Sequence, residues 1–300
     1  MEVNVLEVIQ LKDVRKTYGE LIAVERVSLS IRKGEVFGVL GHNGAGKTTL
    51  LEMMEGVHQP DQGEVKVMGM DALTSRAFKE KIGVQLQATS LHHHLKVKEL
   101  LRLFASFYKE ALPIEELVKE FELAPLLNQY FKRLSGGQKQ KVSLAIAVIH
   151  NPNIVFLDEP STGLDPGIRH IVWKYIQNFK KQGKTVVITT HYMEEAESLC
   201  DRVALIEKGK VLTVDTPKEI INGLNIQSRV IFIRPENLDV GKLTEVSGLT
   251  FKHTGDSIEV KTNDVEKVIQ RLYRWSEEQN WQIEGLRIEH GSLNDYFKSH

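Results

Sequence analysis

The fold of this chain is decided by one short stretch, Gly41-His42-Asn43-Gly44-Ala45-Gly46-Lys47-Thr48. It fits the pattern G-x-x-x-x-G-K-[ST], whose glycines let backbone N–H groups turn inward around phosphate oxygens. The lysine of the pattern, Lys47, is placed to reach the β- and γ-phosphates, and the hydroxyl of Thr48 is offered to Mg²⁺. The stretch therefore predicts a phosphate-binding loop for a nucleotide.

The residues on either side of the loop have the pattern that such a loop needs. An apolar run over residues 35–40 reads as a buried strand that enters the loop, and Thr48-Thr49-Leu50-Leu51-Glu52-Met53-Met54 reads as a helix that leaves it. Phosphate at a helix N-terminus is favoured by free N–H groups and by the helix dipole. The alternative is an ordinary glycine-rich turn, which would not need this strand and helix around it.

Two further apolar runs end in polar residues. Residues 153–157 lead into Asp158 and Glu159, and residues 184–190 lead into His191. Near-continuous apolar strands suit a parallel sheet that is covered on both faces, and ligands of such sheets sit beyond the carboxyl ends of the strands. We therefore expect Asp158, Glu159 and His191 to meet at the phosphate-binding loop.

The chemistry of phosphoryl transfer predicts a role for each of these residues, because the protein mainly positions groups and stabilises charge on the γ-phosphoryl oxygens. Asp158 is expected to hold Mg²⁺ through water, and Glu159 to polarise the attacking water as general base. His191 is expected to contact the γ-phosphate and to orient that water. The alternative for Glu159 is a surface carboxylate beside Pro160.

The pentapeptide Leu134-Ser135-Gly136-Gly137-Gln138 is a candidate for a second phosphate-binding segment. Ser135 is a good N-cap, and residues 138–149 read as the helix that follows it. Gly136 and Gly137 would permit close backbone approach to an anion at this helix N-terminus. Taken alone, the pentapeptide is equally compatible with a capped helix that has a glycine-rich start.

Together these motifs resemble the ATP-binding cassette (ABC) family. The resemblance implies that the Ser135–Gln138 segment grips the ATP held by the Lys47 loop of a partner, so the active form is expected to be a homodimer with two ATP molecules at its seam. It also implies a P-loop NTPase (RecA-like) α/β core with an antiparallel β-subdomain and a helical subdomain.

Three further positions match the family. By resemblance, Tyr18 stacks on adenine, Gln87 touches Mg²⁺ and transmits its state to a membrane partner, and Asp165 lies in a loop that crosses to the other subunit. Gln85 is a nearby alternative to Gln87, and Tyr18 is alternatively a core or surface residue. Lys141 stands where many members carry Arg, which keeps the charge but loses the planar fork.

The motifs predict a domain organisation of residues 1–218 as the ABC ATPase domain, with its helical subdomain at about 88–150, and residues 219–300 as a small α+β accessory domain. In this second part, residues 229–233 read as a strand, and two strands flank Gly255 and Asp256 as a hairpin. Residues 264–278 read as an amphipathic helix. A strand is expected from Trp281 to Glu284, and a capped helix over residues 292–297.

Composition narrows the function further. The 39 basic and 40 acidic residues balance, so nucleic acid is not expected as a partner. The single Cys200 excludes an internal disulfide and fits a reducing cytoplasm. No run approaches the ~20 apolar residues that cross a bilayer, so no direct membrane insertion is expected. The run His92-His93-His94 reads as a solvated loop rather than a metal site.

The stretch over residues 189–203 resembles the export-type subfamily, whose membrane partner is a separate polytopic permease. The predicted function is therefore the ATP-binding and ATP-hydrolysing subunit of an exporter, held at the cytoplasmic face of the cell membrane by that permease. Two alternatives stay open: the ATPase subunit of an importer, and a soluble cassette ATPase acting on ribosomes or DNA. Cargo contacts would lie on the permease, so this chain does not name the cargo.

Overall fold

The computed structural model describes residues 6–75, 77–85, 94–223, 227–233, 251–278 and 280–289. The chain separates into two compact units, Met1–Pro217 and Lys218–His300. The predicted site residue Gln87, the histidines His92 and His93, and the expected helix over residues 292–297 lie outside the described residues.

The centre of the first unit is a six-stranded sheet with the order β10-β9-β3-β8-β7-β6. Its strands are β3 (Val36–Leu40), β6 (Ile82–Val84), β7 (Ile154–Asp158), β8 (Thr185–Thr190), β9 (Arg202–Glu207) and β10 (Lys210–Asp215). All neighbours are parallel except β10, which pairs antiparallel with β9. The three strands predicted to end at the site, β3, β8 and β7, are consecutive, so their carboxyl ends share one edge.

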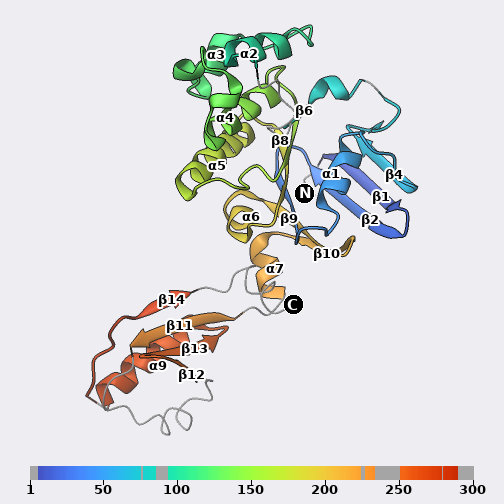
Figure 1. Ribbon diagram of the computed structural model, residues 1–300. Coiled ribbons are helices and arrows are strands. Elements are labelled where there is room, and N and C mark those ends of the chain that lie inside the picture. The colour runs from blue at the N-terminus through green and yellow to red at the C-terminus, as the bar shows by residue number, and fades with distance from the viewer. Residues whose placement is uncertain are drawn as a thin grey trace. The chain divides into compact units, whose positions relative to one another are not determined.

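A second, four-stranded antiparallel sheet is built from β1 (Glu7–Tyr18), β2 (Leu21–Arg32), β4 (Gln62–Val67) and β5 (Met70–Asp71), in the order β2-β1-β4-β5. Helix α1 (Lys47–Met54) contacts β2 and β4 of this sheet and also β7 and β8 of the parallel sheet. Leu50, Leu51, Met53 and Met54 of α1 are buried in the cluster that joins the two layers. The helix that follows the loop is thus held between two sheets (Figure 1).

The remaining helices of this unit lie on the parallel sheet or beyond it. They are α2 (Val97–Ala105), α3 (Ile114–Glu120), α4 (Gly136–Ala147), α5 (Pro166–Lys181) and α6 (Met193–Leu199). Figure 1 shows α2, α3 and α4 gathered at one end of the unit, where the sequence predicted a helical subdomain. Helix α4 begins two residues earlier than expected, because Gly136 and Gly137 form its first turn rather than preceding it.

The second unit contains a four-stranded antiparallel sheet with the order β12-β13-β11-β14. Helix α7 (Pro217–Gly223) begins at the last residue of the first unit and continues into the second, whose further elements are β11 (Ser228–Ile233), β12 (Phe251–Thr254), β13 (Ser257–Thr262), α9 (Val265–Glu278) and β14 (Arg287–Glu289). The predicted hairpin is present, with Thr254 opposite Ser257 across Gly255 and Asp256. Val268 and Leu272 of α9 pack with Val230 and Phe232 of β11, so the apolar stripe of the helix is the unit's own core.

One predicted strand in this unit is wrong. Residues 281–284 are not a strand, and β14 begins only at Arg287. The apolar residues that suggested a strand serve the core instead: the Trp281 ring stacks against Phe232 at 6.0 Å and meets Trp275 edge-on at 5.2 Å. A turn at Gly285, with φ of 60°, separates them from the strand.

Candidate functional site

The loop between β3 and α1 has the backbone conformation that its glycines allow. Gly44 and Gly46 have φ of 80° and 99°, in the left-handed region that favours glycine. A Cβ on Gly46 would also lie 2.1 Å from the carbonyl oxygen of Ala23 in β2, which leaves no space for a side chain. Helix α1 begins at Lys47. Its first backbone N–H groups have no acceptor within the helix, so they are available at the loop.

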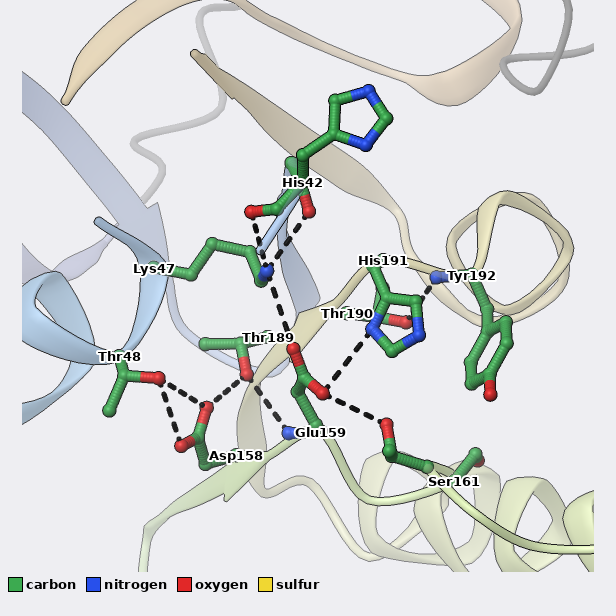
Figure 2. A network of polar contacts seen from close by, with 12 residues as sticks. His42, Lys47, Thr48, Asp158, Glu159, Ser161, Thr189, Thr190, His191 and Tyr192 are labelled. Carbon is green, nitrogen blue, oxygen red and sulfur yellow. Dashed lines mark hydrogen bonds and ion pairs between the residues drawn. The ribbon is translucent and has the colours of Figure 1, made fainter. Parts of the chain in front are cut away.

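Lys47 is nearly enclosed, with 4% of its surface exposed. Its Nζ donates hydrogen bonds to the carbonyl oxygens of Gly41, at 2.9 Å, and His42, at 3.1 Å. It also lies 3.3 Å from Oε1 of Glu159 at the end of β7. Figure 2 shows the Lys47 side chain reaching across the mouth of the loop toward this carboxylate. The ammonium is thus held in place by the loop's own backbone.

Asp158, the last residue of β7, faces the first turn of α1. Its two carboxylate oxygens lie 3.3 and 3.1 Å from Oγ1 of Thr48, which donates to them. Thr189 of β8 donates a further short hydrogen bond to Asp158 (Figure 2). A hydroxyl and a carboxylate are therefore paired at the point where the predicted Mg²⁺ ligands were expected to meet.

Glu159 has an unusual backbone for a non-glycine residue, with φ of 45°. The backbone N–H of Glu159 donates to Oγ1 of Thr189 at 2.9 Å, which supports this conformation. Its side chain turns toward Lys47 of the phosphate-binding loop. Thr162, three residues further along the chain, donates from Oγ1 to Oε2 of Glu159 at 3.0 Å. Burial raises the pKa of Glu159, but the Thr162 hydrogen bond and the charges of Lys47 and His191 outweigh it, so the pKa is lowered overall. The carboxylate is therefore kept ionised, as a general base requires.

His191, directly after β8, lies on the other side of this carboxylate. Its Nδ1 is 3.3 Å from Oε2 of Glu159 (Figure 2). The next residue, Tyr192, donates its backbone N–H to Thr190 Oγ1 at 2.9 Å, and its ring lies 4.3 Å from the His191 ring. The structure thus brings Lys47, Thr48, Asp158, Glu159 and His191 together at one sheet edge.

The Ser135–Gln138 segment forms a complete capping box. Ser135 Oγ accepts from the backbone N–H of Gln138 at 3.3 Å, and Gln138 Oε1 accepts from the Ser135 N–H at 2.9 Å. A Cβ on Gly137 would lie 2.5 Å from Ile168 in α5, so this helix start is packed closely against α5. In Figure 1, α4 and α1 stand apart, with strands of the parallel sheet between them.

Three further residues named from the sequence, Tyr18, Asp165 and Gln85, have contacts with other partners. Tyr18, at the end of β1, is 43% exposed, with Lys16 over its ring at 5.6 Å and the His58 ring edge-on at 6.3 Å. Asp165 is exposed and is the N-cap residue of α5, where Pro166 starts the helix. Gln85 continues β6, with its backbone N–H donating to Phe156 at 2.9 Å.

Two residues at the site were not singled out from the sequence. Thr189 contacts both Asp158 and Glu159, and Thr162 donates to Glu159. The available signals were a threonine at the end of an apolar strand and a hydroxyl three positions after the carboxylate. Neither pattern is specific, because the pairing of β7 with β8 is what places Thr189 beside Asp158.

These residues fit a nucleotide with Mg²⁺. The loop offers backbone N–H groups and a buried ammonium for phosphate oxygens, and the left-handed glycines make the concave shape that anions favour. Thr48 and Asp158 supply oxygen ligands, which Mg²⁺ prefers, in contact with each other beside the loop. In the part of the chain that the structure describes, no cluster of histidine, cysteine and carboxylate side chains forms a separate metal site.

Comparison with known proteins of similar sequence shows the family of this chain. The ABC transporter family model matches residues 24–162, and a model for the C-terminal domain of ABC transporter domain-containing proteins matches residues 228–292. A Nod factor export ATP-binding protein I from a Rhizobium species is 37% identical over 273 residues, which cover 84% of this chain and 88% of the relative. One from Burkholderia orbicola is 38% identical over 257 residues, covering 81% and 84%.

Solved structures of ATP-binding cassettes have a similar fold. An ATP-binding cassette in a dimeric post-hydrolysis state, bound to ADP and phosphate, is 30% identical and superimposes with a TM-score of 0.63, covering 69% of this chain and 98% of the cassette. A nucleotide-free cassette from an ABC transporter gives a TM-score of 0.65 at 25% identity, covering 73% and 96%.

The sheet, the loop and the strand ends define a P-loop nucleotide-binding protein with a cassette-type core. With these relatives, the chain belongs to the ABC transporter family. The relatives named above are export ATP-binding proteins, and the predicted fold class is confirmed. In the described ranges, no helix is both long and apolar enough to cross a membrane.

Proposed function

We propose that this chain binds ATP with Mg²⁺ in the loop of residues 41–49, hydrolyses it through Glu159, and powers export through a separate membrane permease. The observation that carries the proposal is the pair of contacts that Glu159 makes with Lys47 and with His191, each at 3.3 Å. A phosphate-binding lysine, an ionised carboxylate and a histidine at one sheet edge are the groups that γ-phosphoryl transfer to water needs.

Each residue has a defined task in this proposal. Lys47 and the loop N–H groups bind the phosphate oxygens and stabilise the charge that develops on them. Glu159 accepts the proton of the attacking water, and His191, 3.3 Å away, orients that water and contacts the γ-phosphate. Thr48, Asp158 and Gln87 would hold Mg²⁺, which neutralises charge on the transferred group. Tyr18 would stack on the adenine.

The Ser135–Gln138 segment is proposed to act in a second copy of the chain. Its capping box fixes a helix N-terminus, and there is open space around Gly136, where an added Cβ would meet only Leu164, at 3.7 Å. Two copies would then enclose two ATP molecules, each held by the Lys47 loop of one copy and the Ser135 segment of the other. Asp165 would lie near the crossing between the copies. The dimeric solved cassette supports this arrangement.

The proposed partner is a polytopic permease that carries the cargo path, with this chain at the cytoplasmic face of the membrane. The names of the relatives, which are Nod factor export ATP-binding proteins, support export rather than import. The accessory unit, whose boundary we propose near residues 218–219, matches a C-terminal domain model of ABC transporter domain-containing proteins. Capture of the partner distinguishes this function from the two alternatives, an importer subunit and a soluble ATPase that acts on ribosomes or DNA.

The test is capture of the partner. Full-length Glu159→Gln, loaded with ATP and Mg²⁺, is used as bait in detergent-solubilised native membranes, and co-purifying proteins are identified by mass spectrometry. Lys47→Ala, which is expected to lose ATP, is the matched control. A stoichiometric polytopic membrane protein, captured by the first bait and not the second, supports the proposal. Ribosomal proteins or nucleic acid would support the soluble alternative, and a permease accompanied by an external binding protein would support import.

A further inference from the structure

Glu195, a buried carboxylate close in sequence to His191, has none of the roles described so far. Glu195 in α6 has no exposed surface, although it is a residue type that is rarely enclosed without partners. Its Oε1 accepts a hydrogen bond from Ser161 Oγ at 2.5 Å and another from Trp173 Nε1 at 3.0 Å. Trp173 Nε1 also lies 3.2 Å from Ser161 Oγ, so the three side chains form a closed triangle.

The triangle joins two segments that carry catalytic groups. Ser161, also without exposed surface, lies two residues after Glu159 on the loop that leads to Asp165 and α5. Glu195 lies in the first turn of α6, four residues after His191. A displacement of either segment would break hydrogen bonds that have no water to replace them, which is the costly case for buried polar groups.

A second contact ties helix α5, which follows the 159–165 loop, to the His191 segment. The guanidinium of Arg169, in the first turn of α5, lies over the Tyr192 ring at 4.3 Å from its centre. The Tyr192 ring in turn lies 4.3 Å from the His191 ring. Helix α5 therefore touches the His191 segment at two places, through Trp173 and through Arg169.

Burial disfavours the charged form of the Glu195 carboxyl. Burial raises its pKa, against the opposing effects of hydrogen bonds from Ser161, Thr190 and Trp173 and of the charge on Arg169. Replacement of this carboxyl by an amide removes a charged form that burial makes unfavourable. The amide oxygen of glutamine can accept the same two hydrogen bonds.

We propose that Glu195, through its hydrogen bonds with Ser161 and Trp173, is a positioning residue that sets the placement of Glu159 relative to His191. It does not touch the nucleotide. It holds the 159–165 loop and the start of α6 as one unit, so that the general base and the residue that orients its water keep their 3.3 Å contact. The inference rests on the proposed roles of Glu159 and His191.

The experiment measures steady-state ATP hydrolysis and ATP binding by the full-length chain. The variants are Glu195→Ala, Glu195→Gln, Ser161→Ala and the double variant of Glu195→Ala with Ser161→Ala. Glu194→Gln, the exposed neighbour, is the matched control. We expect Glu195→Ala to lower kcat about tenfold or more, because small misplacements of reacting groups are costly, while the affinity for ATP stays unchanged.

Two results separate positioning from general stability. Glu195→Gln is expected to restore most of kcat, because its oxygen accepts from Ser161 and Trp173, and the double variant is expected to lose little more than Glu195→Ala alone. If Glu195→Ala does not fold, Ser161→Ala and Glu195→Gln still decide the matter. The inference is overturned if the folded alanine variants hydrolyse ATP at the wild-type rate, if their losses multiply, or if only ATP affinity falls.

Failure of the proposed function gives a different pattern. If Glu159→Gln hydrolyses ATP as fast as the wild-type chain, the assignment of the general base is wrong. If Glu159→Gln is inactive while Glu195→Ala is fully active, the base stands and only the positioning role of Glu195 is rejected.

Discussion

Nζ of Lys47 lies 3.3 Å from Oε1 of Glu159, so an ion pair joins the phosphate-binding loop to the end of β7. The lysine is nearly enclosed, and the loop carbonyls of Gly41 and His42 also hold it. The same carboxylate contacts His191 through its other oxygen. One carboxylate therefore lies between the ammonium proposed to bind phosphate and the imidazole proposed to orient water.

Replacing Glu159 is expected to separate binding from hydrolysis. Glu159→Gln keeps the shape of the side chain but removes the base, so ATP turnover should fall by about 10² or more while ATP still binds. The measurement is phosphate release alongside titration with a fluorescent ATP analogue. Glu110→Gln, an exposed position in the helical part, should behave as wild type. Near-normal turnover by Glu159→Gln would reject this residue as the base.

Replacing Lys47 is expected to affect binding first. Lys47→Ala removes the ammonium held by Gly41 and His42, so the affinity for ATP should fall by about tenfold or more, with turnover falling in parallel. Isothermal titration with ATP and Mg²⁺ measures the loss. Lys181→Ala, an exposed lysine at the end of α5, is the control. Unchanged ATP affinity in Lys47→Ala would mean that the nucleotide binds elsewhere.

ATP is expected to bring two copies together when hydrolysis is blocked. Sedimentation velocity on Glu159→Gln should show a monomer without nucleotide and a dimer with ATP and Mg²⁺. Adding Lys47→Ala to this variant should abolish the ATP-dependent dimer, because the loop no longer holds the nucleotide at the seam. Monomer at every protein concentration in the presence of ATP would contradict the proposed role of the Ser135–Gln138 segment.

Two loop glycines allow a matched test of the loop geometry. Gly44 and Gly46 both have positive φ, but only a Cβ on Gly46 would collide with a backbone carbonyl, that of Ala23 at 2.1 Å. Both alanine variants should lose about 1 kcal/mol to backbone strain, and Gly46→Ala should lose clearly more. Chemical denaturation of the two variants gives the difference. Equal losses would mean that the contact between the loop and β2 yields easily.

The pH dependence of stability should show the effect of Glu55, which caps the end of α1 and is 8% exposed. Burial, with the negative charges of Asp158 and Glu52, raises its pKa from 4.5 to about 8. A raised pKa in the folded chain means that the folded state binds the proton more tightly. Its contribution to stability is therefore complete below about pH 4.5 and is lost as the pH rises toward 8.

Glu55→Gln removes this titration. Relative to the variant, the wild-type chain should lose unfolding free energy between about pH 5 and pH 7, on the order of 2 kcal/mol as an upper bound. Urea denaturation of both proteins without nucleotide, at several pH values, measures the difference. Glu110→Gln, with its exposed carboxylate, should show no such trend. Parallel curves for wild type and Glu55→Gln would show that Glu55 is ionised without penalty.

Much of the core of the site could be predicted because its signals are local. The Lys47 loop lies between a strand and a helix that the pattern of apolar residues predicts. Asp158 and His191 each come at the end of an apolar run, which predicts a strand in the same way. Ser135 and Gln138 form a capping box across three residues, which sequence alone also indicates. The strand expected at Trp281–Glu284 failed because aromatic residues also fill a core without pairing in a sheet.

The amino-acid sequence by itself determined the phosphate-binding loop, the strand that ends at Asp158, the strand that ends just before His191, and the capped start of α4. Each depends on residues within one turn or strand. Only the tertiary structure decided that β3, β8 and β7 are neighbours, that Thr189 holds Asp158, and that Glu195 meets Ser161 and Trp173. The side-chain contacts join residues 22 to 34 positions apart, and the pairing of β3 with β8 brings Val36 beside Val186, so strand order and helix packing, rather than local pattern, bring such residues together.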